Sequence, residues 1–187
     1  MKLPPPQPRQ MLHERRVITR GFLRDDGLWD IEGEIVDEKG YDSVDRERGT
    51  LPAGTPYHNM CARLTVDNDL KIHEVATSMP ATPFAYCPGA NDPTQGLVGK
   101  SLTRGFRRAV DDTLGGVRSC THLRDLILSM ATTAYQTIFA YQLQFTPDQV
   151  DTTFGNDAPP FFINRCRTWA ESTPVVAQYY PKYYRKP

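Results

Sequence analysis

The chain has 187 residues, of which 39% are hydrophobic and 24% are charged, and its formal net charge is zero. This length suits one domain with a substantial core. The balanced charge argues against a nucleic-acid-binding surface and against a disordered acidic chain. No apolar run approaches the roughly 20 residues that a membrane helix needs. We therefore expect neither a nucleic-acid partner nor a membrane partner.

The N-terminal residues are rich in proline and contain no apolar core of a secretory signal. We predict that residues 1–16 form an N-terminal arm and that residues 17–187 form a single α+β domain with an aromatic C-terminal tail. The four cysteines are widely spaced and form no C-x-x-C pair. Without a signal peptide, this pattern favours reduced thiols and a cytoplasmic protein.

Two hairpins are predicted in the first half of the chain. Strands at 17–24 and 28–37 flank the turn signal Asp25-Asp26-Gly27, and strands at 60–67 and 70–78 flank Asn68-Asp69. The polar stretch between the hairpins, 40–56, is longer than a hairpin loop needs, which is typical of loops that serve sites. Along the strand at 28–37 the side chains alternate, so that one sheet face is apolar and the other polar. The apolar set is Trp29, Ile31 and Ile35, and the polar set is Asp30, Glu32 and Glu34.

Helices are predicted in the second half. Ser101 is positioned to cap a helix that ends at Gly115-Gly116, and a long amphipathic helix runs from Cys120 to about Phe145. Strands followed by helices indicate an α+β fold, with an antiparallel sheet of about four strands and helices packed on one face. The apolar stripe of the long helix recurs at helical spacing. It comprises Leu123, Leu126, Ile127, Met130, Ala134 and Ile138.

Eight ordered stretches carry a family pattern: 21–30, 37–39, 48–49, 54–60, 63–67, 97–100, 120–123 and 131–134. Through them the chain resembles, over nearly its whole length, the domain-of-unknown-function family 2889. The resemblance implies a bacterial cytoplasmic protein associated with the catabolism of aromatic compounds, some of them derived from lignin. The chain departs from the pattern at Cys166-Arg167, where the family has Cys-His.

A second resemblance concerns architecture. A strand hairpin, a cysteine-containing loop, Val98-Gly99-Lys100-Ser101 and a helix begun by a cysteine follow one another as in NifU-type iron–sulfur scaffold proteins. This fold-level analogy implies a NifU- or SufE-like fold. Because those proteins carry a three-cysteine metal site, it singles out Cys87, Cys120 and Cys166.

Cys120 and His122 fall in the first turn of the predicted long helix, where free N–H groups favour a thiolate and disfavour an imidazolium. Thiolate and imidazole are good zinc donors, so Cys87, Cys120 and His122 form a candidate site for zinc or an iron–sulfur cluster. The competing interpretation is a buried cysteine that packs as a small apolar residue beside a histidine that caps backbone.

His58 is the second candidate base. We expect His58 or His122 to accept a proton, with Asp26 or Asp30 orienting a histidine or an arginine. The competing interpretation is a histidine at the sheet edge, with Arg63 in a salt bridge to Asp30 or Glu32 and Tyr135 packing in a helix. The residues predicted to bind a substrate anion or an aromatic ring are Arg24, Arg63, Tyr57, Trp29 and Tyr135.

No nucleotide motif is present, because Leu97–Ser101 lacks the first glycine of a phosphate loop at its required spacing. We therefore predict a cytoplasmic acid–base lyase without a cofactor that acts on a small aromatic, lignin-derived substrate, for example by eliminating formaldehyde from a diaryl side chain. The alternatives are a metal-binding or iron–sulfur scaffold-like protein and a non-catalytic ligand-binding module. We also expect a homodimer that forms through the polar sheet face or through the aromatic tail at 179–184.

Overall fold

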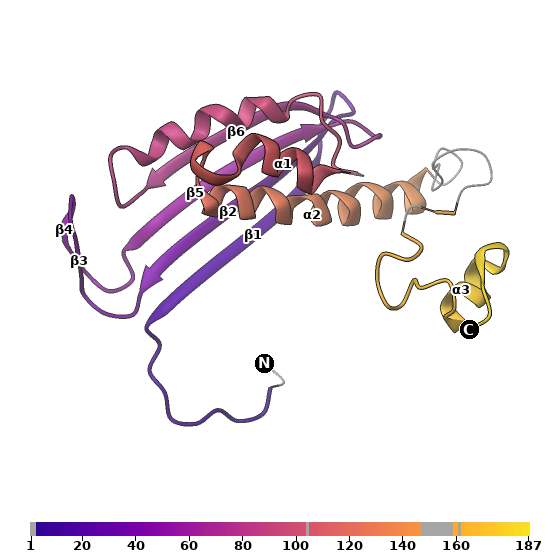
Figure 1. Cartoon of the computed structure of the whole chain (residues 1–187), viewed down its shortest axis with the longest axis horizontal. Coiled ribbons are helices and arrows are strands. Elements are labelled where there is room, and N and C mark those ends of the chain that lie inside the picture. Colours follow the sequence, from indigo (N-terminus) through magenta and orange to yellow (C-terminus); the bar gives the residue numbers. More distant parts are fainter. Residues whose placement is uncertain (1–2, 104, 147–158, 161) are drawn as a thin grey trace. The chain divides into compact units, whose positions relative to one another are not determined.

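The structure is a computed structural model that describes residues 3–103, 105–146, 159–160 and 162–187 (Figure 1). The chain falls into two compact units, Met1–Ala140 and Tyr141–Pro187. The candidate catalytic side chains all lie in the first unit. Within the described residues, no helix combines the length and the hydropathy that crossing a bilayer requires.

The first unit is built on a four-stranded antiparallel sheet in the order β1-β2-β5-β6. Helices follow the strands, which confirms the predicted α+β class and its two hairpins. The predicted turn at Gly27 is present, with a φ of 83° that glycine adopts without strain. The strands are β1 (His13–Leu23), β2 (Trp29–Lys39), β5 (Pro56–Val66) and β6 (Ile72–Ala81).

Two strand predictions need correction. The stretch 40–56 is not only a loop, because it contains a small separate hairpin of β3 (Ser43–Asp45) and β4 (Gly49–Leu51). The carboxylate of Asp45 closes that hairpin by accepting the backbone N–H groups of Glu47 and Arg48. In addition, β1 begins at His13 rather than at residue 17, so its first four residues overlap the predicted arm.

The helices comprise the 3-10 helix η1 (Cys87–Leu97), α1 (Phe106–Leu114), a short 3-10 turn η2 (Gly116–Arg118) and α2 (Thr121–Phe145). The predicted end of the first helix, at Gly115-Gly116, is confirmed, but the prediction that Ser101 caps this helix was wrong. Ser101 forms a β-bridge with Lys71, and α1 starts only after Gly105, which has a φ of 81°. The long helix was predicted correctly, and its carbonyl at Cys120 accepts the first helical hydrogen bond from Arg124.

Helix α2 lies close over β1 and β2 (Figure 1). The close approach depends on two glycines of the sheet. A Cβ at Gly33 would stand 2.9 Å from the sulfur of Met130, and a Cβ at Gly21 would overlap the side chain of Thr137. A hydrogen bond of 2.6 Å between Thr19 and Thr133 ties the same surfaces together. This packing places the first turn of α2 over the end of β2 and the start of β5.

The second unit contains α3 (Pro174–Tyr179) and a 3-10 turn, η4 (Pro181–Tyr183). Thr173 caps α3 by accepting a hydrogen bond from the N–H of Val176. Three partly buried aromatic rings from separate parts of the unit pack against one another. They are Phe162, Trp169 and Tyr180.

Candidate functional site

The candidate site is centred on Asp37, near the end of β2. In a strand, alternate residues share a face, so Asp37 continues the row of Trp29, Ile31, Gly33 and Ile35 that α2 covers. Its side chain is only 1% exposed. The register shifts immediately after it, between Asp37 and Glu38, and such bulges commonly re-aim side chains next to active sites.

Arg15 is the main partner of this buried carboxylate. It is the residue opposite Asp37 in the β1–β2 pairing, and its Nε and Nη2 donate to Oδ1 and Oδ2 at 2.7 and 2.8 Å. His13, two residues earlier, places Nε2 3.1 Å from Oδ1. Burial raises the pKa of Asp37, but the hydrogen bonds and charge of Arg15, aided by two further histidines, hold that pKa below its ordinary value. Asp37 is therefore a carboxylate.

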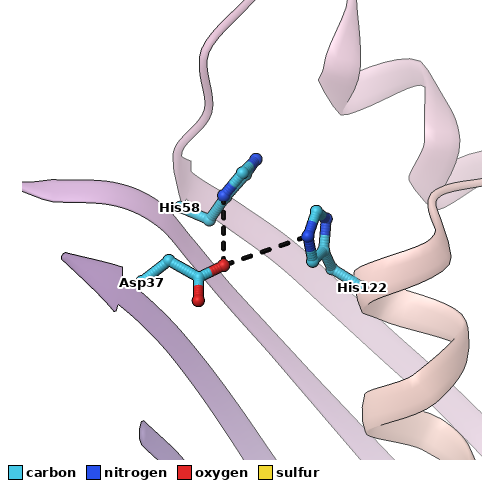
Figure 2. Close-up of side chains that lie close together, drawn as sticks. All are labelled: Asp37, His58 and His122. Carbon is cyan, nitrogen blue, oxygen red and sulfur yellow. Dashed lines mark ion pairs between the residues drawn. The ribbon is translucent and has the colours of Figure 1, made fainter. Parts of the chain in front are cut away.

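His58 and His122 approach the same carboxylate oxygen from different elements (Figure 2). His58 is opposite Asp37 in the β2–β5 pairing, and its Nδ1 lies 3.1 Å from Oδ2. His122, in the first turn of α2, has Nε2 3.9 Å from Oδ2. The centroids of the two imidazole rings are 4.3 Å apart. Figure 2 shows that the second ring nitrogen of His58 points away from Asp37.

Both imidazoles have pKa values below the ordinary 6.5. Burial lowers the pKa of His58, and the charge of His122 lowers it further, against the opposing influence of Asp37. Burial also lowers the pKa of His122, and the charge of Arg15 adds to this effect, while Asp37 and Asp125 oppose it. Two adjacent neutral imidazoles can accept protons at neutral pH, and they can equally serve as metal ligands.

Other side chains pack around the two histidines. The Sγ of Cys120 lies 3.4 Å from Nδ1 of His122, on the ring edge away from Asp37. The ring of Tyr57 packs edge-on against His58, with centroids 5.6 Å apart. Arg48, from the turn between β3 and β4, lies over the Tyr57 ring and donates to the carbonyls of Pro56 and Tyr57. The small hairpin thus braces the strand segment that carries His58.

A metal ion has one candidate set of ligands among the described residues. One carboxylate oxygen of Asp37 and one ring nitrogen from each of His58 and His122 lie within 4.8 Å of one another. Two imidazoles and a carboxylate are a donor set that zinc, iron and manganese accept. The predicted thiol site is not gathered in this way, because neither Cys87 nor Cys120 belongs to the converging group. Arg15 also places a positive charge beside Asp37, which opposes a cation there.

Several predicted site residues lie elsewhere. Asp30 is seven residues from Asp37 on the same strand, so it points to the opposite sheet face and lies about 23 Å along the sheet. It accepts a hydrogen bond of 2.6 Å from Thr65. Asp26 is in the turn after β1 and forms a two-point ion pair with Arg24. The structure thus does not bring Asp26, Asp30 or Arg24 to the histidines.

The remaining predicted residues have structural partners. Arg63 lies on the uncovered sheet face, 3.8 Å from Glu32, in an open hollow of about 370 Å³ that also includes Arg20 and Glu34. Trp29 is buried, and its Nε1 donates to the side chain of Asn68. Tyr135 donates its hydroxyl to the carbonyl of Leu102. Of the predicted substrate-binding residues, the structure brings Tyr57 to the histidine cluster.

Asp37, Arg15 and His13 were not recognised from the sequence as site residues. A signal for Asp37 was available, because extending the alternation of Trp29, Ile31 and Ile35 by one step puts a carboxylate on the covered face. An unpaired buried carboxylate is costly, and a cationic neighbour was therefore to be expected. Arg15 and His13 were missed because β1 was predicted to begin after them.

Comparison with known proteins places the chain in one family. Residues 13–136 match the family model described as a protein of unknown function (DUF2889). The chain belongs to the DUF2889 family. The match begins at His13 and includes Arg15, Asp37, His58 and His122, so the whole cluster lies within the family domain. Neither a curated protein nor a solved structure matches the chain, and the NifU-like fold stays a prediction.

Proposed function

We propose that this DUF2889 protein is a cytoplasmic lyase of aromatic compound catabolism that uses acid–base chemistry and no organic cofactor. The supporting observation is the pairing of two imidazoles of lowered pKa around one buried carboxylate. Groups whose pKa values are shifted by burial and by specific neighbours are typical of active sites. The aromatic and lignin-derived class of substrate comes from the family resemblance.

In this proposal His58 is the proton acceptor. An Nδ1–H group of His58 that donates to Asp37 leaves the lone pair on Nε2, and that nitrogen points away from the carboxylate (Figure 2). Asp37 would therefore fix the ring and its tautomer, and it would stabilise the imidazolium that forms. His122, whose ring is 4.3 Å away, is close enough to share the proton.

The reaction proposed is the loss of formaldehyde from a diaryl compound that carries a hydroxymethyl group beside a benzylic hydroxyl. His58 removes the hydroxyl proton of the hydroxymethyl group. As formaldehyde forms, the bond between the hydroxymethyl carbon and the neighbouring carbon of the substrate breaks. The released electron pair forms a carbon–carbon double bond, and the benzylic hydroxide leaves. The imidazolium returns its proton to that hydroxide, so the products are formaldehyde, water and a diaryl alkene. Atoms and charge balance without an oxidant or a reductant.

The experiment is to incubate the purified protein with such a diaryl compound and to follow formaldehyde and the alkene by proton NMR. We expect turnover by the native protein, and a loss of about 100-fold or more in His58→Gln. His73→Gln is the matched control, because His73 also pairs with an aspartate, Asp67, but on β6 outside the site. Binding of the compound without any change in it would favour the non-catalytic ligand-binding module and would overturn the lyase.

A divalent metal centre is the second candidate, and one observation favours it. Nδ1 of His58 and Nε2 of His122 lie 3.1 and 3.9 Å from Oδ2 of Asp37, which is close to the spacing of neighbouring ligands around one ion. An ion held there would supply Lewis acidity to a bound oxygen. Metal analysis of the protein purified without chelator tests this. Stoichiometric metal that is lost in both His58→Gln and His122→Gln would favour the metal centre, and metal-free protein with full turnover would exclude it.

A further inference from the structure

The thiol of Cys120 borders the histidine cluster, and the proposed lyase reaction does not use it. Its Sγ is 3.4 Å from Nδ1 of His122, and the opposite ring nitrogen of His122 is 3.9 Å from Oδ2 of Asp37. Thiol, imidazole and buried carboxylate therefore follow one another in the order of an activated cysteine nucleophile. In such arrangements the imidazole takes the thiol proton, while the carboxylate orients the ring.

The charges around Cys120 support the same role. Cys120 is the residue before α2, and its carbonyl already accepts the helical bond from Arg124. Cys120 is therefore at the positive end of the dipole of a 25-residue helix. The guanidinium of Arg15, which is itself paired with Asp37, is also within electrostatic range of the sulfur. The thiol also donates to the sulfur of Met60, a weak acceptor 4.0 Å away, and Cys120 packs against the hydrophobic core.

The other cysteines provide a comparison within the same chain. Burial raises the pKa of the Cys61 thiol, and the charges of Glu34 and Glu32 raise it further, so that thiol stays protonated. Cys166 is exposed, and its access to a reagent is therefore better than that of the half-buried Cys120. A faster reaction at Cys120 than at Cys166 would consequently have to come from activation rather than from exposure.

We propose that Cys120 is a nucleophilic thiol that forms a covalent adduct with a soft carbon electrophile, a conjugated carbonyl compound, with His122 as its base. The sulfur attacks the β-carbon, a C–S bond forms, and the π electrons of the C=C bond move through the α-carbon to the carbonyl oxygen. Nδ1 of His122 receives the thiol proton and returns it to the α-carbon. No atom leaves, and no oxidant is needed.

This inference does not depend on the lyase reaction, since adduct formation needs Cys120 and its base but not turnover at His58. The two proposals can therefore fail separately. The probe is N-ethylmaleimide, a conjugated carbonyl reagent, added to the full-length protein in less than stoichiometric amount. Peptide mass spectrometry then gives the labelling rate at each cysteine, so that every sample contains its own reference.

In the native protein we expect Cys120 to be labelled before Cys166 and Cys61. In His122→Gln we expect the labelling rate at Cys120 to fall about tenfold, with the rate at Cys166 in the same sample unchanged. His73→Gln should leave both rates as they are. Labelling of Cys166 first in the native protein, a comparison that requires no variant to fold, would overturn the proposal. So would an unchanged rate at Cys120 in a His122→Gln protein that retains the native circular dichroism spectrum.

Discussion

The Oδ2 atom of Asp37 lies 3.1 Å from Nδ1 of His58, and both residues sit on the sheet face that α2 covers. Arg15 is the residue opposite Asp37 on β1, the strand that flanks β2 on the side away from β5. The preceding side chains of β2 on this face, those of Trp29, Ile31 and Ile35, are apolar. The hydrophobic core therefore ends at Asp37, where a charged cluster begins. His122 closes the cluster from the helix side.

Removing the charge of Asp37 should destabilise the fold. In Asp37→Asn the guanidinium of Arg15 loses a two-point ion pair to a side chain that is 1% exposed, and we expect the free energy of unfolding to fall by at least about 2 kcal/mol. The neighbouring Glu38→Gln is the matched control. Glu38 pairs with the exposed Arg16, and ion pairs of this kind at the surface contribute little to stability. Urea denaturation measures both, and equal losses would contradict the central role of Asp37.

Stability should fall as the pH drops below neutrality. The folded pKa values of His58 and His122 are below their ordinary value of 6.5, so below that pH the unfolded chain binds more protons than the folded one. Each such proton contributes a slope of up to about 1.4 kcal/mol per pH unit. Stabilisation by Asp37 is lost in a lower window, as the pH falls through its folded pKa below 3.8.

Melting temperatures recorded from about pH 7.5 to about pH 5.5 measure the histidine contribution. The charged groups that act on the two imidazoles are Arg15, Asp37 and, for His122, Asp125. We expect a flatter curve in a protein that carries both His58→Gln and His122→Gln. His73→Gln should leave the native pH dependence in place, and a flattening of equal size there would argue against the cluster.

The imidazole titrations can be observed directly by proton NMR. Both His58 and His122 should titrate below 6.5. Because Asp37 raises both pKa values, Asp37→Asn should lower them further. Because the charge of His122 lowers the pKa of His58, His122→Gln should raise the pKa of His58. Shifts in the reverse directions would show that the cluster is not assembled in solution.

A small residue at position 21 is required for the helix to reach the sheet. In Gly21→Ala the new methyl group would overlap the side chain of Thr137, and we expect a loss of about 1–3 kcal/mol in the free energy of unfolding. Gly89→Ala is the control, since a Cβ at Gly89 would meet no atom within 4 Å. Chemical denaturation compares the two, and a neutral Gly21→Ala would mean that α2 packs farther from β1.

The sequence patterns predicted the hairpins and the long helix because those elements have local signals. Gly27 supplies the φ of a tight turn, and the spacing from Leu123 to Ile138 matches a helical stripe. The pairing of Cys120 with His122 was likewise recognised from two positions in one helical turn. All of these residues are close to one another in the sequence, so local patterns are enough to predict their arrangement.

The partners of the site are not local, which is why the sequence was less informative there. Arg15 and Asp37 are 22 positions apart, and they meet because of the strand register. Arg24, Asp30 and Arg63 were predicted to be site residues because of their chemical type. Side chains alternate between the two faces along a strand, and Asp30 and Arg63 occupy positions that point to the uncovered face. Chemical type identified the histidines. The alternation along β2 could have placed Asp37 on the covered face, but the pairing of the strands was needed to show that His58 and Arg15 lie beside it.

The position of Asp37 on its strand also constrains how the family can vary in length. An insertion or deletion of one residue between Trp29 and Asp37 would turn the carboxylate to the uncovered face and separate it from His58. The segment from Gly40 to Thr55 carries no such restriction, because most of it lies outside the main sheet. Members of the DUF2889 family should accordingly keep a constant number of residues along β2 and differ in length in the connection that follows it.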